Sequence, residues 1–585
     1  MESNVIKKVN VQIEQIVIAA YRKAVSEGFF EDCADEGEIR IEIPQDTSYG
    51  DFSTSFAMVS AKKLRMAPIK IAQKIAELAD LDNSYFHKVE TAGPGFINFF
   101  LNDKWYAEVL GTIETCKEAY GKNLQGKNQK VMVEFVSANP TGPMHIGNAR
   151  GGVLGDTLAN VLLANGFDTY REFYVNDAGN QVHKFAVSLN ARYMQMIYGE
   201  DNFEFPEEGY QGDDIRDLAQ QIYAEYGTSL VDMDEEVRFK VMSDFGLKVN
   251  IPLMKSDLEK YRINYDTWFL ESSLYSNDFV ADTVEKMIQM DLTYEKDGAL
   301  WLKTTRLLTE KYLREGKTEE QIGRLNLKDD VLKRSNGFYT YFAADIAYHR
   351  HKFEIRNFDK VINVWGVDHI GHVPRLQAAL DGLGLDGSNR LVIVLMHLVN
   401  LMKDGEPVRM SKRSGKAIAL RDLLEEISVD AARYFFNSRS ASSAIDFDLD
   451  LAVKTDSDNP VYYIQYAYAR INSLFANLVD DHLVKYDDIY NADVSVLKLD
   501  SELSLIKALA LYPSELVLAA NEYDPSYINR YLFSLAGAFH RFYNNNRIKG
   551  EVDEIRNARL RLANATRIVL KNGMDIIGIS VLEKM

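Results

Sequence analysis

The chain has 585 residues, 46% of them hydrophobic, which is enough for several domains with buried cores. Its net charge of −19 argues against a generally basic nucleic-acid-binding protein, so any contact with nucleic acid must lie in local patches. The two cysteines, Cys33 and Cys116, lie outside any CxxC or histidine spacing, which argues against a disulfide framework and a zinc site built on thiolates.

Residues 1–24 mix charged and apolar side chains, a pattern typical of an amphipathic helix and not of a signal peptide. No uninterrupted apolar run reaches the roughly 18 residues of a membrane span. We therefore expect a cytoplasmic protein that binds neither a membrane nor DNA.

The pattern along the chain divides it into three parts. Residues 1–120 predict a separate α+β domain, which a polar linker joins to the next part. Residues 131–450 alternate strands and helices, as a Rossmann-like parallel sheet requires, with a mostly helical insertion at about 188–333. Residues 459–585 predict an all-α bundle. The strands expected nearest the chemistry are 131–136, 168–174, 360–365 and 391–395.

Residues 131–165 are the most informative segment: an apolar strand, a loop with Pro140 and Pro143, and a helix that begins at His145. The N-terminus of such a helix binds anions, because its free N–H groups and the positive end of the helix dipole face the ligand. His145 can donate to a phosphate and Gly147 leaves room for a flat base, so the segment predicts a nucleotide pocket. A glycine-containing helix packed closely on a sheet is the alternative.

A second segment, residues 402–416, is polar and basic and follows an apolar run. Lys412 and its flanking arginines can meet a developing negative charge, and Gly405 and Gly415 are candidate hinges of a phosphate-binding loop. A solvated basic loop is the alternative for an isolated charge run. Both segments in this order favour nucleotide binding.

With these two segments the chain resembles the class I aminoacyl-tRNA synthetases, whose motifs are written HIGH and KMSKS. Asn148 stands where the family usually has a second histidine, and Arg409 and Arg413 replace the outer residues of the second motif. Asn148 can donate a hydrogen bond but cannot carry charge. The catalytic residues that the resemblance implies are His145, Asn148 and Lys412. The nucleotide-binding residues that it implies are His145, Gly147, Asn148, His369, Met410, Ser411 and Lys412.

The first motif is similar to the form found in arginyl-tRNA synthetases, and it consists of Ala138, Asn139, Pro140, Thr141, Gly142, Pro143, Met144, His145, Ile146, Gly147 and Asn148. Further segments similar to that family lie at 93–100, 268–273, 340–348 and 459–471, so the resemblance spans most of the chain. It implies an enzyme that ligates L-arginine to tRNA(Arg) in two steps. A monomer is a separate expectation. ATP with Mg²⁺ is the expected substrate complex, with no structural zinc or other metal site, and the C-terminal bundle is expected to bind the anticodon. A class I synthetase for another amino acid is the nearest alternative, and a non-catalytic tRNA-binding relative or a small-molecule nucleotidyltransferase would belong to other classes.

The amino-acid pocket can be argued from the chemistry of a guanidinium, which has five donors and no acceptor and therefore needs carboxylates with an aromatic or hydroxyl partner. Glu271, Tyr341 and Asp345 form such a set, and the last two are spaced to share one helix face. The resemblance assigns all three to arginine binding. Ordinary surface acids and a core tyrosine are the alternative. His349 and His351 are interpreted as packing or solvated side chains and not as metal ligands.

The α-amino and carboxylate groups of the substrate need partners near the first motif. The resemblance places Ser137 and Asn139 at this end, with Glu134 beside them. Asp368 follows an apolar strand and can hold the amino group, while capping of the next helix is its competing role. His369 is expected near the adenosine.

Contacts with tRNA are expected at both ends of the chain. Residues 530–571 carry nine Lys and Arg against three acidic residues, interleaved with aromatic residues, which suits phosphates and unstacked bases. A basic surface for solubility alone is the alternative. In the N-terminal domain an aromatic strand is expected to touch an unstacked base, with strand core as the alternative. The residues predicted to contact tRNA are Phe96, Asn98, Phe100, Arg541 and Arg559.

Overall fold

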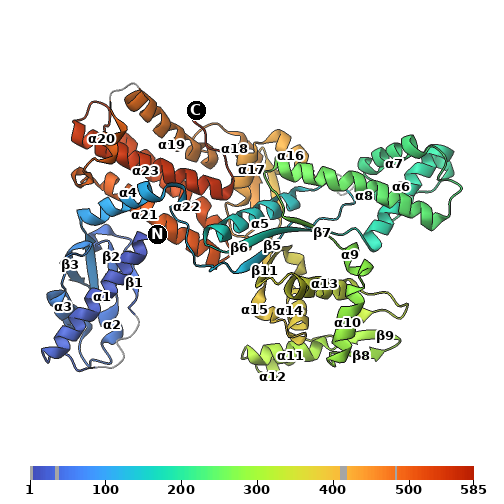
Figure 1. Cartoon of the computed structure of the whole chain (residues 1–585), viewed down its shortest axis with the longest axis horizontal. Coiled ribbons are helices and arrows are strands. Elements are labelled where there is room, and N and C mark those ends of the chain that lie inside the picture. Colours follow the sequence, from blue (N-terminus) through green and yellow to red (C-terminus); the bar gives the residue numbers. More distant parts are fainter. Residues whose placement is uncertain (1–3, 33–38, 409–417, 481–483) are drawn as a thin grey trace.

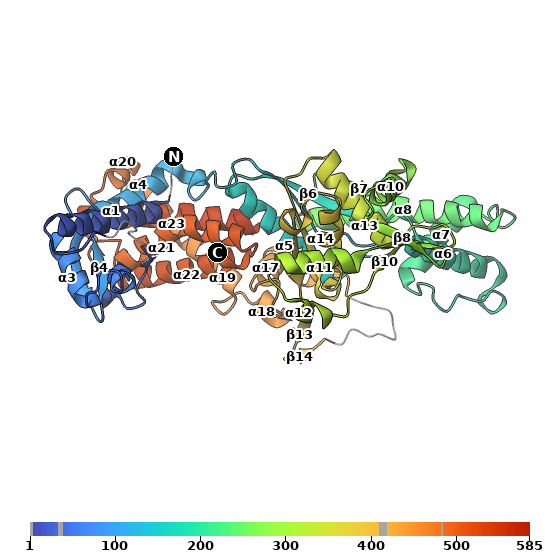
Figure 2. The ribbon, with the colours of Figure 1, turned by 90° about the horizontal axis from the view of Figure 1, so that it is seen from below.

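The computed structural model describes residues 4–32, 39–408, 418–480 and 484–585. The molecule is elongated: the N-terminal domain and the C-terminal helices share one end, and the helices between residues 180 and 260 form the other (Figures 1 and 2). The central sheet lies between the two ends.

The N-terminal region contains an antiparallel sheet, ordered β1-β2-β4-β3, packed with helices. The first helix begins at Val5 because the Asn4 side chain accepts a hydrogen bond from the Lys7 N–H at 2.9 Å, and its apolar residues recur on one buried face. The predicted α+β character of this region is confirmed. Its elements are α1 (Val5–Ser26), β1 (Ile41–Glu42), β2 (Phe52–Thr54), α2 (Phe56–Ser60), α3 (Pro68–Leu78), β3 (Phe86–Ala92), β4 (Phe96–Leu101) and α4 (Asp103–Cys116).

The central sheet has five parallel strands in the order β12-β11-β5-β6-β7. The middle strand is an apolar run because both of its faces are covered, and Val131, Met132 and Val133 are at most 1% exposed. The strand order reverses between β5 and β11, which leaves a crevice at the carboxyl ends of these strands. The Rossmann-like prediction is confirmed. The strands are β5 (Lys130–Glu134), β6 (Asp168–Val175), β7 (Thr267–Leu270), β11 (Lys360–Gly366) and β12 (Leu391–Met396).

The sequence predicts one mostly helical insertion at 188–333. In the structure β7 lies within this range and pairs with β6 of the central sheet, so the insertion consists of two parts, one before β7 and one after it. A four-residue strand that follows the long helix Glu235–Lys260 carries too little periodicity to be recognised in the sequence. The first part contains α6 (Asn180–Tyr198), α7 (Asp213–Tyr226) and α8 (Glu235–Lys260). The second part surrounds an antiparallel sheet, ordered β10-β9-β8. Its elements are α9 (Ser272–Ser276), α10 (Phe279–Gln289), β8 (Thr293–Lys296), β9 (Ala299–Leu302), α11 (Thr304–Arg314), α12 (Glu319–Gly323) and β10 (Asp330–Lys333).

Helices and a small mixed sheet complete the central region. The sheet has the order β14-β13-β15. The elements are α5 (Ile146–Ala164), α13 (Tyr341–Arg350), η4 (His351–Ile355), η5 (Val367–His369), α14 (Val373–Gly382), α15 (Gly387–Arg390), β13 (Val399–Lys403), β14 (Glu406–Pro407), α16 (Leu420–Glu426), α17 (Val429–Phe436), β15 (Ile445–Asp448) and α18 (Leu449–Val453).

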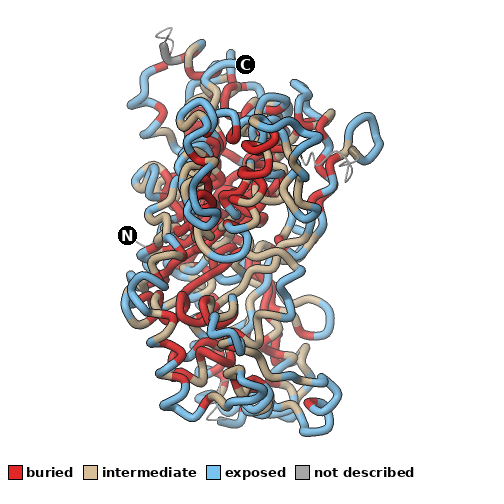
Figure 3. The backbone as a smooth tube through the Cα atoms, turned by 90° about the vertical axis from the view of Figure 1, so that its right-hand side faces the viewer, coloured by how far each residue is buried: buried red, intermediate tan, exposed pale blue. Residues whose placement is uncertain are grey.

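The C-terminal region is all-α in its described residues, as predicted. Figure 3 shows that, over the whole molecule, buried residues lie mainly inside and exposed residues mainly on the outer loops. Of the helices in the described ranges, α21 is long and apolar enough to cross a membrane by those two criteria, but half of its apolar window is buried and it packs on α22, α23 and α5. It therefore has the character of a core helix. The elements are α19 (Pro460–Phe475), η6 (Ala476–Asp480), α20 (Tyr486–Tyr490), α21 (Asp500–Asn521), α22 (Ser526–Asn545) and α23 (Asp553–Ile577).

Candidate active site

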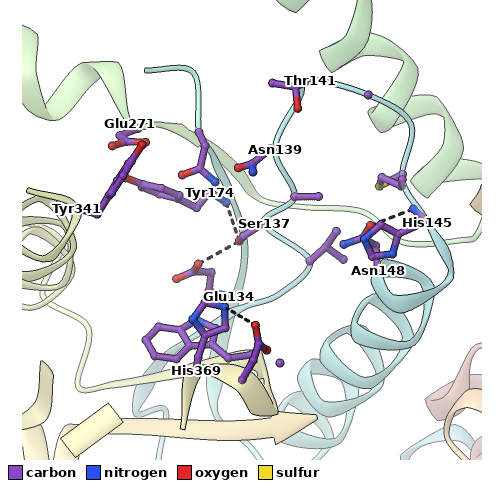
Figure 4. Close-up of a pocket in the computed structure, with 18 of the residues that line it drawn as sticks. Glu134, Ser137, Asn139, Thr141, His145, Asn148, Tyr174, Glu271, Tyr341 and His369 are labelled. Atoms are coloured by element: carbon purple, nitrogen blue, oxygen red, sulfur yellow. Dashed lines mark hydrogen bonds and ion pairs between the residues drawn. The ribbon is translucent and has the colours of Figure 1, made fainter. Parts of the chain in front are cut away.

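A cavity of about 1430 Å³ opens at the carboxyl ends of β5 and β11, where the strand order reverses. Its walls come from the first motif, from the segment after β11, from α13 and from residues 209–212 of the helical insertion. Figure 4 shows Glu271 and Tyr341 on one side of the cavity and His145 and Asn148 on the other. The fold therefore brings both predicted ends of the site to one cavity.

His145 is the N-cap residue of α5, and its ring turns back onto the helix end. Nδ1 accepts a hydrogen bond from the Gly147 N–H at 3.2 Å. Desolvation by the surrounding protein lowers the pKa of His145, so the ring is neutral near pH 7. Because Nδ1 is the acceptor, the proton lies on Nε2, which is left as a donor to a ligand.

Asn148 completes a reciprocal cap with His145, since its Oδ1 accepts a hydrogen bond from the His145 N–H at 3.0 Å. Its amide nitrogen makes no hydrogen bond within the described residues and belongs to a side chain that lines the cavity. A Cβ at Gly147 would lie 3.1 Å from Cε1 of His145. A side chain here would therefore press on the histidine ring, which would have to shift by a few tenths of an ångström. Room for a flat base, the role expected from the sequence, stays a prediction.

The segment that follows the second motif lies against the first motif. Ala419 forms an isolated antiparallel bridge with His145, and the Leu420 N–H donates to the Met144 carbonyl at 2.8 Å. Before the second motif in the sequence, β13 and β14 form an antiparallel hairpin. The motif residues Met410, Ser411, Lys412 and Gly415 lie outside the described residues, so their roles stay predictions.

Glu134 and Ser137 are joined by a hydrogen bond at the end of β5. The Ser137 hydroxyl donates to Glu134 Oε1 at 3.0 Å and accepts from the Tyr174 N–H at 3.2 Å. The other carboxylate oxygen of Glu134 lies 2.5 Å from Nζ of Lys352, which is fully buried. Glu134 therefore neutralises an internal cation and holds Ser137, while Asn139 lines the same cavity.

The opposite end of the cavity is acidic. Glu271 is 3% exposed, and burial, together with the nearby Asp177 and Asp345, raises its pKa to about 7. Tyr341 begins α13 and is mostly exposed, and its hydroxyl accepts a hydrogen bond from the Asn180 N–H at 3.2 Å. A bound cation would favour the ionised form of Glu271.

Asp345 also lies on α13 and lines the cavity, and two histidines hold its carboxylate. Oδ2 lies 2.6 Å from Nε2 of His372, and Oδ1 lies 3.1 Å from Nδ1 of His349. Burial acts to raise the pKa of Asp345, but its interactions with His349 and His372 outweigh burial and hold the pKa well below its usual range. Asp345 is therefore ionised at neutral pH.

Asp368 and His369 lie on η5, with side chains that are 80% and 59% exposed and 3.7 Å apart. The N-cap position of the next long helix, α14, is His372, so Asp368 does not take the competing role of capping that helix. The His369 ring centroid lies 5.9 Å from that of Trp365, and all three residues line the cavity.

Several cavity residues were not among the predicted site residues. Tyr174, Tyr210, Gln211, His372 and Arg375 line the cavity together with the predicted residues. Tyr210 and Gln211 come from the loop before α7, and only the tertiary fold brings this loop to the sheet. No spacing or motif could have identified them.

The N-terminal residues predicted to contact tRNA lie on β4, where they differ in burial. Phe96 and Phe100 are half-buried. Asn98 is 3% exposed, and its Oδ1 accepts a hydrogen bond from the Ser53 hydroxyl at 2.7 Å. This geometry favours the alternative of strand core for Asn98 and keeps Phe96 and Phe100 as candidates.

The two predicted arginines of the C-terminal bundle also separate. Arg541 is exposed on α22. Arg559 is buried, and its guanidinium lies 2.7 Å from Glu502 Oε1 and 2.5 Å from the Arg547 carbonyl. The prediction of a tRNA contact is corrected for Arg559, because its donors are used inside the bundle.

Comparison with known proteins agrees with this arrangement. Family models match three consecutive regions: the arginyl tRNA synthetase N-terminal domain at residues 9–101, the class I (R) tRNA synthetase catalytic domain at 112–454, and the DALR anticodon binding domain at 464–585. Arginine–tRNA ligases of Acetivibrio thermocellus and Caldanaerobacter subterraneus are each 47% identical to this chain, over 583 and 584 residues. Each alignment covers 100% of this chain and 100% of the relative.

Solved structures give the same result. A putative arginyl-tRNA synthetase from Campylobacter jejuni is 35% identical with a TM-score of 0.72, covering 83% of this chain and 100% of its own. The Thermus thermophilus arginyl-tRNA synthetase has the same fold at 19% identity, with a TM-score of 0.70 over 98% of this chain and 100% of its own. The chain therefore belongs to the arginyl-tRNA synthetase family of class I aminoacyl-tRNA synthetases.

Proposed function

We propose that this protein ligates L-arginine to tRNA(Arg) in the cytoplasm, as a monomer, using ATP. The proposal rests on one cavity that has a helix N-terminus at one end and, at the other, the buried Glu271 and the partly buried Asp345. The first end suits the phosphates of a nucleotide, and the second suits a guanidinium. An amino acid held between them has its carboxylate directed toward the nucleotide.

In the first step the arginine carboxylate attacks the α-phosphorus of ATP in line, the bond to the β-phosphate oxygen breaks, and pyrophosphate leaves. Nε2–H of His145 and the amide of Asn148 are available to donate to the phosphates. Lys412 supplies a positive charge that stabilises the negative charge developing on the phosphates. No protein nucleophile takes part, so catalysis consists of positioning and electrostatic stabilisation.

Mg²⁺ enters with ATP as part of the substrate. Within the described residues there is no group of three or more His, Cys, Asp and Glu side chains suited to a metal ion. We propose that Glu271, Tyr341 and Asp345 bind the guanidinium, and that Glu134, Ser137, Asn139 and Asp368 lie around the main-chain end.

In the second step the 2′-hydroxyl of the terminal ribose of tRNA attacks the arginyl carbonyl carbon, and AMP leaves. The DALR anticodon binding domain at 464–585 is one expected contact with tRNA. The N-terminal domain is the other, through Phe96 and Phe100.

ATP–pyrophosphate exchange with each of the twenty amino acids, with and without tRNA, tests the proposal. We expect exchange with arginine alone among the twenty, and dependence on tRNA. Exchange supported by a different amino acid would make the protein a synthetase for that amino acid. No exchange under any condition would contradict a catalytic role.

A further inference from the structure

A chain of buried polar groups connects Asp345 with Glu134 behind the wall of the cavity. Its three inner members, His349, Asn363 and Lys352, are at most 1% exposed. His349 and Lys352 are three residues apart where α13 continues into η4, and the fold brings Asn363 of β11 to both of them. A buried polar group is costly unless it is hydrogen-bonded. Each of these side chains must therefore face a matching donor or acceptor, and this requirement determines which group donates in each hydrogen bond.

The direction of each hydrogen bond in the chain follows from Lys352. An ammonium group has three donors and no acceptor, so Asn363 must turn Oδ1 toward Nζ of Lys352, 3.5 Å away. The Asn363 amide nitrogen then faces Nε2 of His349 at 2.8 Å and donates to it. His349 Nε2 is therefore an unprotonated acceptor, and the ring is neutral with its proton on Nδ1.

This tautomer makes His349 a donor to Asp345. Nδ1 lies 2.8 Å from the Asp345 carbonyl oxygen and 3.1 Å from Oδ1. A neutral donor orients the carboxylate and leaves its charge in place, whereas an imidazolium would cancel that charge. Each carboxylate oxygen has two lone pairs, so Asp345 keeps acceptor sites for a ligand although His372 also binds Oδ2.

We propose that His349 is a positioning residue for recognition of the guanidinium, and that Asn363 and Lys352 hold it in the donor tautomer. This inference rests on the proposed function, since it takes arginine as the ligand of Asp345. At its other end the chain reaches Glu134, which binds Lys352 and Ser137. The two ends of the amino-acid site are thus connected through buried hydrogen bonds.

Three substitutions separate the donor from the packing of the ring. His349→Asn keeps an N–H close to the position of Nδ1, His349→Leu keeps apolar bulk without a donor, and Asn363→Asp favours the charged ring because a carboxylate accepts from Nε2. By calorimetry, we expect the Kd for arginine to rise about 10- to 100-fold in His349→Leu and Asn363→Asp, but to stay within about threefold of wild type in His349→Asn.

The KM for ATP in aminoacylation is expected to stay unchanged in all three variants, because the buried polar groups from Asp345 to Glu134 do not reach the nucleotide end of the cavity. His351→Asn is the matched control: His351 is half-buried on η4, and its Nδ1 has no partner in the described part of the chain. Its arginine Kd is expected to equal that of wild type.

Equal weakening in His349→Asn and His349→Leu, or wild-type affinity in His349→Leu and Asn363→Asp, would overturn the positioning role. If His349→Leu does not fold, the contrast between Asn363→Asp and His349→Asn decides. A wild-type protein that fails to bind arginine would instead overturn the proposed function, so the two failures are distinguishable.

Discussion

At the residue scale, the first turn of α5 combines a structural and a chemical role. The side chains of His145 and Asn148 each accept a hydrogen bond from the backbone of this turn, so both stabilise the helix end. The remaining donors are Nε2–H of His145 and the amide nitrogen of Asn148. A substitution at either position therefore changes stability and nucleotide binding together unless it is chosen to separate them.

Substitutions at Asn148 can separate these roles. Asn148→Ala should cost about 1–3 kcal/mol of transition-state stabilisation through the lost phosphate contact, and Asn148→His should be nearly neutral. Asn148→Asp keeps the acceptor for the His145 N–H but places a negative charge near the phosphates. We expect it to melt like wild type and to have a raised KM for ATP. Equal activity in wild type and Asn148→Ala would show that the contact is dispensable.

Glu271 predicts a pH dependence of arginine binding. Its carboxyl group is half-protonated at about pH 7 in the free site and must be ionised to pair with a guanidinium, so binding releases a proton. The affinity should therefore fall as pH falls, with the Kd rising about tenfold from pH 8 to pH 6. Calorimetry in buffers of different ionisation enthalpy measures the released proton directly. Glu271→Gln should bind weakly without this dependence; a flat wild-type profile would contradict the assignment.

Lys412 is expected to act on the transition state rather than on the bound amino acid. Lys412→Ala should lower kcat about 100- to 1000-fold, roughly 3–4 kcal/mol, with little change in the KM for arginine. Lys403→Ala is the control, because Lys403 lies on β13 in an exposed ion pair with Glu426. Near-normal turnover of Lys412→Ala would remove this lysine from the mechanism.

At the element scale, α5 connects the active site with the C-terminal bundle. Arg433 of α17 is fully buried, and its Nη2 lies 2.6 Å from Asp156 Oδ2 of α5. Its Nε donates to the Ile577 carbonyl at 2.9 Å, at the end of α23. A parallel contact runs from the Asn160 side chain of α5 to the Ile576 carbonyl at 2.9 Å. The helix that carries the first motif is therefore bonded directly to the last helix of the chain.

Removal of one partner from this buried pair should be strongly destabilising. Arg433→Met leaves Asp156 with the partly exposed Arg171 as its remaining cation, and we expect a loss of about 3–5 kcal/mol in the free energy of unfolding. Chemical denaturation monitored through tryptophan fluorescence measures it. Lys240→Ala breaks an exposed ion pair on α8 and should stay within about 0.5 kcal/mol of wild type. Similar stability of the two variants would contradict this account.

At the scale of the whole molecule, burial decides which basic residues can meet tRNA. Arg541→Ala should raise the KM for tRNA without loss of stability, because Arg541 is exposed on α22. Arg559→Ala should instead destabilise the bundle, because it leaves the carboxylate of Glu502 without its buried partner. Aminoacylation at varied tRNA concentration and thermal melting distinguish the two. A raised KM in a stable Arg559→Ala would restore Arg559 as a tRNA contact.

The sequence by itself determined the elements whose signal is local. The four strands expected near the chemistry correspond to β5, β6, β11 and β12. Short strand-like segments that alternate with helical patterns can be recognised without tertiary information. The helix N-terminus at His145 could also be predicted from the sequence, because the loop residues and the cap residue are adjacent in the chain. Glu271, Tyr341 and Asp345 came from chemistry and from family resemblance, and the fold places all three at one cavity.

Only the tertiary structure decided what depends on contacts between distant residues. Whether Arg559 faces solvent or Glu502, and whether Asn98 is core or surface, cannot be derived from periodicity, because both answers fit the same pattern. The positive φ angles of Val136 and Ser137, 68° and 43°, are likewise imposed by their surroundings, since such residues avoid this region. The tautomer of His349 depends on its contact with Asn363 of β11 and on the contact of Asn363 with Lys352. Asn363 lies 14 residues from His349 in the sequence, so no local sequence pattern predicts these contacts.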